Sequence, residues 1–243
     1  MKIITLNTWG NSGPYQDRWN LFLEELERYH PDVLCLQEVF ELTLPEKIKK
    51  KFSFQNVSAS YEAGLVIMTR FPKFSEQVLS YESISPSEQQ NRQAILVGLK
   101  IKSKEIIIAN THLAWKTEDE PVRYRQVQEL LQTIPIKGYP VLLAGDFNDT
   151  IGSKPVEEIK KAGYVDLCSI SHPGERKITW DNQNPFIRTH SVKFPDRQID
   201  FLFLHKQLLR TITVKTCKIA FNRPNQNGIY PSDHYGVFAE IKF

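Results

Sequence analysis

Nine strand-like segments constrain the fold of this chain more than any other feature. They are rich in β-branched and other apolar residues and cover residues 2–8, 32–39, 64–70, 93–101, 105–113, 140–147, 198–205, 213–221 and 235–243. Several of them are continuously apolar, which is typical of strands that are buried on both faces. The sheets that they form must therefore be covered by other layers.

Helical patterns supply those covering layers. Apolar side chains recur at helical spacing in residues 15–30 and again in residues 123–134. A shorter helix is indicated at residues 153–163, with Ser153 at its start and Gly163 at its end. Strands outnumber helices, so we predict an α/β fold, a four-layer α/β/β/α sandwich with two packed mixed β-sheets flanked by helices.

Composition limits the domain count and the partners. With 243 residues and 41% hydrophobic content, residues 1–243 can form one domain around a large core. The net charge is only +3, so a nucleic-acid-binding protein would have to concentrate its basic residues locally. No signal peptide or membrane-spanning stretch is visible. We expect a cytoplasmic monomer, with export by a route that reads no N-terminal signal left open.

The three cysteines give no sign of a disulfide framework. Cys35, Cys168 and Cys217 are widely spaced and odd in number. Cys35 lies in an apolar strand-like segment, where it would be a small core residue. We therefore expect the chain to fold without a set of disulfide bonds.

Polar residues gather at or near the ends of the predicted strands. They are Asn7, Glu38, His112, Asp146, Asn148, Asp200, Asp233 and His234. Each one alone is more typical of a turn or of a hydrogen-bonded polar group than of a site. Ligand and catalytic sites of α/β folds form at strand ends, however, so eight such residues together predict a functional site.

The chemical types in this set fit a divalent cation. The oxygen donors Glu38, Asn7 and Asp233 suit Mg²⁺, with Mn²⁺ as the alternative, whereas zinc would require a cluster of His or Cys. A buried carboxylate can fix the orientation of an imidazole, which Asp200 could do for His234 if folding brings them together.

Six short motifs carry a resemblance to a known family. The segments LNTW, LQE, NTHLA, GDFN, QID and SDH occur in this order over nearly the whole chain. Any one of them is weak evidence, but the ordered set resembles the endonuclease/exonuclease/phosphatase superfamily of DNase I-like, Mg²⁺-dependent phosphoesterases. The resemblance implies a phosphoric ester hydrolase.

The resemblance also implies a role for each residue that matches a motif. Glu38 would be the principal Mg²⁺ ligand, with Asn7 and Asp233 completing the metal environment. Asp146 would orient or activate the attacking water, and Asn148 would hold a phosphate oxygen. His234, oriented by Asp200, and His112 would contact the phosphate. The general base stays open between Asp146 and His234.

Three further residues are weaker candidates for substrate binding. Arg70 and Arg92 stand where the family often has a basic or polar residue near the cleft, although loop charge explains them equally well. Trp180, in the segment ITWDNQNPF, could shape the pocket or could be a core residue. The remaining histidines, His30, His172, His190 and His205, match no family position and are interpreted as surface or structural residues.

The substrate class follows less directly. NTHLA and DRQID depart from the motifs of AP endonucleases and inositol polyphosphate 5-phosphatases. The pattern is more similar to the sphingomyelinase, deadenylase and tyrosyl-DNA phosphodiesterase branches, which predicts hydrolysis of a phosphodiester in a phospholipid, nucleic acid or small molecule. Two alternatives stay open: a nuclease or deadenylase on single-stranded nucleic acid, which needs aromatic stacking platforms and a basic groove, and a catalytically silent phosphoester-binding module.

Overall fold

The computed structural model describes residues 1–88, 90–134 and 139–243, and its strands form two mixed sheets. The first sheet has the strand order β11-β12-β1-β2-β4-β3. Its strands are β1 (Lys2–Asn7), β2 (Val33–Gln37), β3 (Asn56–Ser60), β4 (Leu65–Thr69), β11 (Thr213–Ala220) and β12 (Gly236–Lys242). Only β1 and β2 pair in parallel in this sheet, while its other neighbours are antiparallel.

The second sheet has the strand order β5-β6-β7-β8-β10-β9. Its strands are β5 (Lys73–Ser80), β6 (Gln93–Ile101), β7 (Lys104–His112), β8 (Val141–Asp146), β9 (Tyr164–Asp166) and β10 (Asp200–His205). Here β7 and β8 form the parallel pair. Each sheet therefore has two adjacent strands that end at the same edge, which is where the polar residues of the sequence stand.

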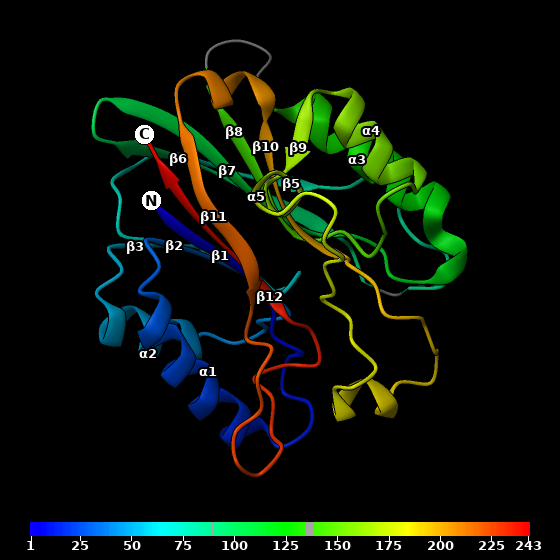
Figure 1. Cartoon of the computed structure of the whole chain (residues 1–243). Coiled ribbons are helices and arrows are strands. Elements are labelled where there is room, and N and C mark those ends of the chain that lie inside the picture. The colour runs from blue at the N-terminus through cyan, green and yellow to red at the C-terminus, as the bar shows by residue number, and fades with distance from the viewer. Residues whose placement is uncertain (89, 135–138) are drawn as a thin grey trace.

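Helices cover the outer faces of both sheets, as Figure 1 shows. The α-helices are α1 (Tyr15–Tyr29), α2 (Thr43–Phe52), α3 (Glu120–Thr133), α4 (Lys154–Lys161) and the short α5 (Leu167–Ser171). The 3₁₀ helices are η1 (Thr117–Asp119), η2 (Pro185–Thr189) and η3 (Lys206–Arg210). Helices α1 and α2 pack on the first sheet, and α3 and α4 pack on the second. The predicted four-layer α/β/β/α sandwich is confirmed.

The alternation of side chains along each strand builds this core. Ile3 and Cys35 point into the layer between the sheets, whereas their neighbours Ile4 and Leu34 pack with α1 and α2. In β8, Leu142 likewise faces the space between the sheets. Because side chains alternate with period two, the inward-facing positions continue to the strand ends, and there they become polar.

Several elements differ from the sequence-based expectation. All nine predicted strands are present, and β3, β5 and β9 are additional. The eight residues of β5 are mostly exposed, and β9 has only three residues, so neither carries the apolar pattern on which the prediction rested. None of the helices among the described residues combines the length and apolar character needed to span a membrane.

The cysteines also depart from expectation. A disulfide joins Cys168 in α5 to Cys217 in β11, and Cys35 is free and buried. The sequence predicted no framework of disulfides, and this single bond was not foreseen; it forms because α5 packs against β11, which brings together two cysteines that lie 49 positions apart. Wide spacing in the sequence gave no hint of this contact.

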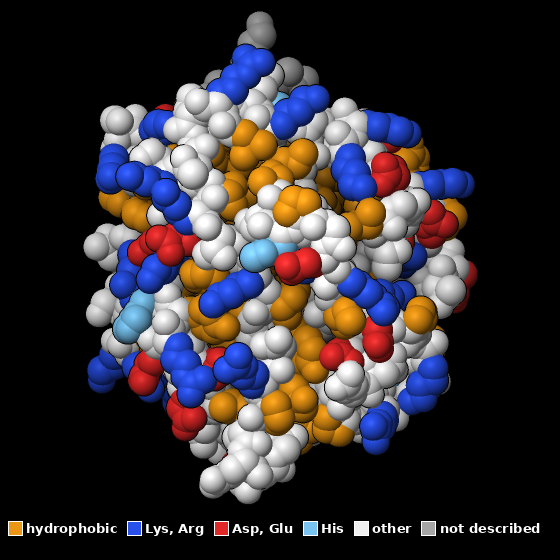
Figure 2. Space-filling view, in the orientation of Figure 1, with side chains coloured by type: hydrophobic (Ala, Val, Ile, Leu, Met, Phe, Trp, Pro, Cys, Tyr) orange, Lys and Arg blue, Asp and Glu red, His pale blue; other side chains and the backbone are white. Residues whose placement is uncertain are grey.

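The surface charge is mixed in sign. On the face shown in Figure 2, Lys and Arg side chains are interspersed with Asp and Glu. This agrees with a chain that has 31 basic and 28 acidic residues. Any selectivity for an anionic partner must therefore come from individual residues at a site rather than from the overall charge.

Candidate active site

The second sheet contributes three of the polar residues through its strand ends. His112 and Asp146 are the last residues of the parallel strands β7 and β8 and stand opposite each other in register. Asp200 begins the antiparallel strand β10 and stands opposite Asp146. The alternation that buries Leu142 and Leu202 between the sheets also turns these three side chains inward.

The first sheet contributes its residues in the same way. Asn7 ends β1, and Glu38 follows directly after its parallel neighbour β2. Asp233 and His234 precede β12, which runs antiparallel to β1. The two sheets therefore deliver their polar residues to one edge of the sandwich.

A polar network between the sheets joins the two halves of this edge. The Gln37 side-chain amide donates to Asn110 Oδ1 at 2.6 Å and to Thr5 Oγ1 at 3.1 Å. Asn110 Nδ2 in turn donates to the carbonyls of Leu36 and Val66. All three polar side chains are buried. Because they bond across the layer, they fix β1 and β2 relative to β7 just below the site.

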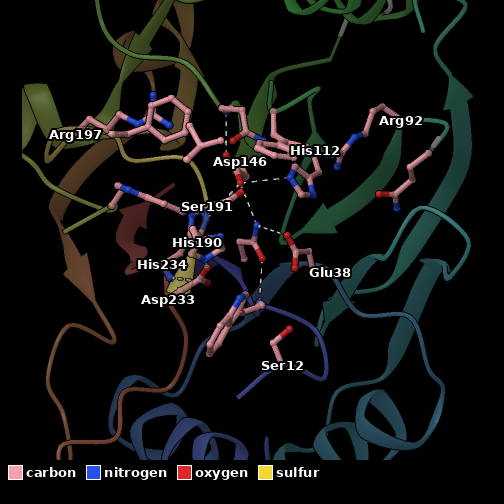
Figure 3. A pocket seen from close by; sticks show the side chains of 18 of the residues that line it. Ser12, Glu38, Arg92, His112, Asp146, His190, Ser191, Arg197, Asp233 and His234 are labelled. Carbon is pink, nitrogen blue, oxygen red and sulfur yellow. Dashed lines mark hydrogen bonds and ion pairs between the residues drawn. The ribbon is translucent and has the colours of Figure 1, made fainter. Parts of the chain in front are cut away.

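The polar residues line one cavity of about 350 Å³ (Figure 3). Nine of the eleven residues predicted from the sequence lie in its wall: Asn7, Glu38, Arg92, His112, Asp146, Asn148, Trp180, Asp233 and His234. Asp200 is fully buried and reaches the cavity through His234. Arg70 does not line this cavity. It lies at a different hollow with Glu24 and Lys51, so the prediction that it stands near the cleft was wrong.

Asp146 is at the centre of the hydrogen-bond network. Its Oδ2 accepts from Asn7 Nδ2 at 3.0 Å and lies 3.4 Å from His112 Nε2 and 3.8 Å from His234 Nε2. Its Oδ1 accepts from the backbone N–H of Asn148. Burial raises the pKa of Asp146 to about 7, with a further contribution from the nearby Asp200. This carboxyl group is therefore poised to exchange a proton near neutral pH.

His234 is held by a buried carboxylate. Its Nδ1 lies 3.0 Å from Asp200 Oδ2, and the edge of its ring contacts Trp180. The Thr179 hydroxyl accepts from the backbone N–H of Asp200, which fixes the start of β10. Burial alone would lower the pKa of His234, but Asp200 and Asp146 outweigh it and keep that pKa well above its ordinary value.

His112 has the opposite electrostatic setting. Burial lowers its pKa well below the ordinary value, and the positive charges of Arg92 and His234 lower it further. The cavity thus combines a neutral imidazole with a cationic one on the two sides of Asp146. Such a pair can donate hydrogen bonds to an anionic oxygen from two directions.

Backbone strain accompanies these residues. Glu38 and Asn148 have left-handed φ angles of +59° and +51°, which non-glycine residues adopt at a cost. Gly145 has φ +140°, and a Cβ atom there would lie 2.0 Å from the Thr111 carbonyl oxygen. Only glycine fits between β7 and β8 at this point, and it lets the GDFN segment turn Asp146 and Asn148 into the cavity.

Oxygen donors for a cation lie on the side of the first sheet. Glu38 is partly buried, and no Lys or Arg among residues 1–88, 90–134 and 139–243 forms an ion pair with it. Its Oε1 accepts from Asn7 Nδ2 at 3.0 Å. Burial and the neighbouring Asp233 raise the pKa of Glu38. Two neighbouring carboxylates beside an amide fit a hard divalent cation.

A second group also has metal-ligand spacing. Ligand atoms of Asp146, Asp200 and His234 lie within 4.8 Å of one another. In this group, however, the imidazole already lies between the two carboxylates and compensates their charge. Among the described residues, Glu38 forms no ion pair, whereas its neighbour Asp233 lies 2.8 Å from His190 Nε2. The Glu38 carboxylate, with Asn7 and Asp233 beside it, is therefore the one most open to a cation.

Sequence reasoning missed two residues that position the site. His190, at the end of η2, lines the cavity, and its Nε2 lies 2.8 Å from Asp233 Oδ2. Asn184 is buried and donates to the carbonyls of Ser232 and Asp233. His190 was interpreted as a surface or structural residue; the structure adds that it lines the cavity beside Asp233. Asn184 lies in the segment ITWDNQNPF that was singled out for Trp180, but neither it nor His190 ends a strand or matches one of the six motifs, so spacing could not reveal them.

The chain belongs to the Endonuclease/Exonuclease/phosphatase family, which it matches over residues 4–234. Members of this family hydrolyse phosphoric esters. Five of the six motifs contribute a residue to the wall of the cavity described above, and the sixth, QID, contributes Asp200, which contacts His234 from behind. Among relatives, human 2',5'-phosphodiesterase 12 is 29% identical over 93% of this chain. Drosophila melanogaster protein angel is 26% identical over 65% of it. The chain spans only 46% and 51% of the lengths of these two relatives.

Solved structures share the fold. D. rerio TDP2 complexed with single-strand DNA product superposes with a TM-score of 0.80 at 21% identity, covering 100% of this chain and 99% of that one. The human nocturnin catalytic domain with bound sulfate has a TM-score of 0.78 at 19% identity, with coverage of 100% and 94%. At these identities, the likeness establishes the four-layer fold.

Proposed function

We propose that the protein is a divalent-metal-dependent phosphodiesterase in which an activated water attacks the phosphorus. One observation carries this proposal: the buried Asp146 carboxylate stands within 3.8 Å of two imidazoles, in the same cavity as Glu38 and Asp233. Phosphodiester hydrolysis needs a base for the water and positive charge for the phosphate oxygens. This arrangement supplies the base and part of the charge from the chain itself.

The proposed division of labour follows from protonation. Asp146, whose pKa lies near 7, accepts a proton from water. The cationic His234, held by Asp200, donates a hydrogen bond to a phosphate oxygen, because an imidazole that already carries its proton cannot act as the base. The neutral His112 donates from the other side. Asn148 holds the phosphate through its side-chain amide. One N–H of this amide donates to the Leu113 carbonyl, and the other is the donor to the phosphate.

Glu38, Asp233 and Asn7 would hold the cation, with Mg²⁺ or Mn²⁺ as the proposed ion. When bound, a divalent ion neutralises charge that develops on the phosphate oxygens. His190 keeps Asp233 in place through the 2.8 Å contact to its carboxylate. Trp180 closes the cavity behind His234 and excludes water from the imidazole.

Hydrolysis of chromogenic esters tests this proposal. We would compare bis(p-nitrophenyl) phosphate, a diester, with p-nitrophenyl phosphate, a monoester, in the presence of Mg²⁺ or Mn²⁺. Asp146→Asn keeps the shape of the side chain but removes the base, so diester turnover should fall by about 10² to 10⁴. Asp17→Asn, on the exposed face of α1, is the matched control and should retain full activity. Wild-type turnover in the Asp146→Asn variant would refute the assignment.

Single-stranded nucleic acid is the favoured substrate among the diesters. The similar proteins include D. rerio TDP2 with single-strand DNA product and 2',5'-phosphodiesterase 12. In this chain, Trp9, Phe40 and Trp115 line the cavity. The exposed ring of Phe40 offers a face on which a base can stack, whereas Trp9 already stacks on Phe186. Binding of a fluorescent oligonucleotide should then weaken steeply as salt increases. Tight binding without metal-dependent cleavage would instead favour a silent phosphoester-binding module.

A further inference from the structure

The catalytic cavity continues into a second cavity. This second cavity has a volume of about 530 Å³. It is lined by residues 148–153, which precede α4, and by Glu120 and Arg123 of α3. It shares Trp115, Asn148, Phe194 and Arg197 with the first cavity. Because Asn148 stands beside Asp146, a group attached to the reacting phosphate can extend past these four residues. Arg197 therefore lies at the junction of the two spaces, and Figure 3 shows it among the residues that line the first.

Arg197 is held firmly but forms no ion pair with an acidic residue in the part of the chain that the structure describes. Its backbone exchanges hydrogen bonds with Trp180, and its guanidinium lies 3.6 Å from the centre of the Phe194 ring. Its Nε is buried and has no hydrogen-bond partner, and its side chain forms no ion pair within the described part of the chain. A planar, partly desolvated guanidinium of this kind is suited to a phosphate.

The three arginines that are buried among the described residues each have carbonyl or carboxylate partners, although Nη1 of Arg92 has none. Arg18 donates to the carbonyls of Thr8, Gly10, Ser12 and Pro231. Arg92 pairs with Glu88 at 2.7 Å, and Arg123 pairs with Asp149 at 2.8 Å. Asp149 is therefore already engaged on the wall of the second cavity. Arg197 differs from them: its positive charge lies at the junction of the two cavities, and no acidic side chain among the described residues contacts it.

We propose that Arg197 binds a second phosphate of the substrate, next to the phosphate that is hydrolysed, and thereby determines specificity. This inference rests on the proposed function, since it assumes that the reacting phosphate lies at Asp146. A second phosphate occurs in an oligonucleotide and in a nucleoside diphosphate. A diester with a cationic headgroup, such as a choline phospholipid, would bring a second positive charge against the guanidinium and is disfavoured.

Binding of small nucleotides tests the proposal without requiring turnover. By calorimetry in Mg²⁺ buffer we would compare thymidine 5'-monophosphate, thymidine 3',5'-bisphosphate and thymidine 5'-diphosphate, with each ligand checked for integrity afterwards. The wild type should bind at least one of the two-phosphate ligands about tenfold more tightly than the monophosphate. The better of the two identifies whether the second phosphate comes from a strand or from a diphosphate.

Arg197→Gln should abolish that preference and leave the affinity for the monophosphate unchanged. Arg197→Lys keeps the charge but loses the planar fork, so it should retain only part of the preference. Arg210→Gln, on an exposed arginine at the end of η3, is the matched control and should behave as the wild type. Phe194→Leu removes the ring that holds the guanidinium and should weaken two-phosphate binding even if Arg197→Gln folds poorly.

Two results would overturn the inference. One is an equal loss for the monophosphate and the two-phosphate ligands in Arg197→Gln, which would place Arg197 on the reacting phosphate. The other is an unchanged preference in a variant whose thermal unfolding matches the wild type. Failure of the proposed function would be seen separately, as absence of metal-dependent diester cleavage, because the binding comparison needs no catalysis.

Discussion

Replacing Asp200 with Asn isolates the contribution of a single buried charge. The substitution preserves size, but it exchanges the charged acceptor 3.0 Å from His234 Nδ1 for a neutral one. Hydrogen bonds to charged groups contribute about 1.5–3 kcal/mol. Since about 1.4 kcal/mol corresponds to a tenfold change in rate, we expect kcat for a diester to fall about 10- to 100-fold. KM should change less, because the interaction strengthens as charge develops on the phosphate.

The assay combines kinetics with a pH profile. Asp200 is the largest of the contributions that raise the pKa of His234, so its loss should lower that pKa. The activity of the Asp200→Asn variant should therefore decline at a lower pH on the alkaline side than that of the wild type. A structural defect alone would not move this limb. Unchanged kcat together with an unchanged alkaline limb would refute the view that Asp200 positions and charges His234.

Two further substitutions probe the backbone of the site and the surroundings of the proposed metal ligands. In a urea titration, Gly145→Ala should reduce the free energy of unfolding by about 3 kcal/mol or more, because its Cβ would clash with the Thr111 carbonyl. The control is Gly152→Ala, at φ +95° with open space around it, which should reduce that free energy by only about 1 kcal/mol. Equal losses would contradict the clash. His190→Ala should raise the Mg²⁺ concentration for half-maximal activity about tenfold, because Asp233 loses its 2.8 Å partner; an unchanged metal titration would contradict this role.

The layered fold was predictable because the apolar patterns are long. Continuous runs such as the one ending at Asp146 indicate strands covered on both faces, and helical spacing in α1 and α3 indicates what covers them. The edge strand β5 was not predicted, because its side chains are mostly exposed and need no apolar alternation. The pairing of Cys168 with Cys217 depends on how α5 docks on β11, which no local pattern encodes.

The site was predictable where a residue ends a strand. Asn7, His112 and Asp146 occupy inward-facing positions whose direction follows from the alternation along each strand. His190 and Arg197 lie in the irregular chain around η2, where direction is set by contacts with Asp233 and Phe194 rather than by periodicity. Sequence motifs therefore identified the polar residues at the strand ends and missed those in the irregular chain beside them.

Metal dependence is the most direct test of the central claim that this cavity hydrolyses a phosphodiester. We would strip the protein with EDTA, add back Mg²⁺ or Mn²⁺ in steps, and follow bis(p-nitrophenyl) phosphate hydrolysis in the wild type and in Glu38→Gln. Because Glu38 has no cationic partner of its own among the described residues, we predict no turnover without metal. Recovery should be full in the wild type, and the variant should remain at least about 100-fold less active at the same metal concentration. Equal rates with and without EDTA, or full recovery of Glu38→Gln, would contradict the account.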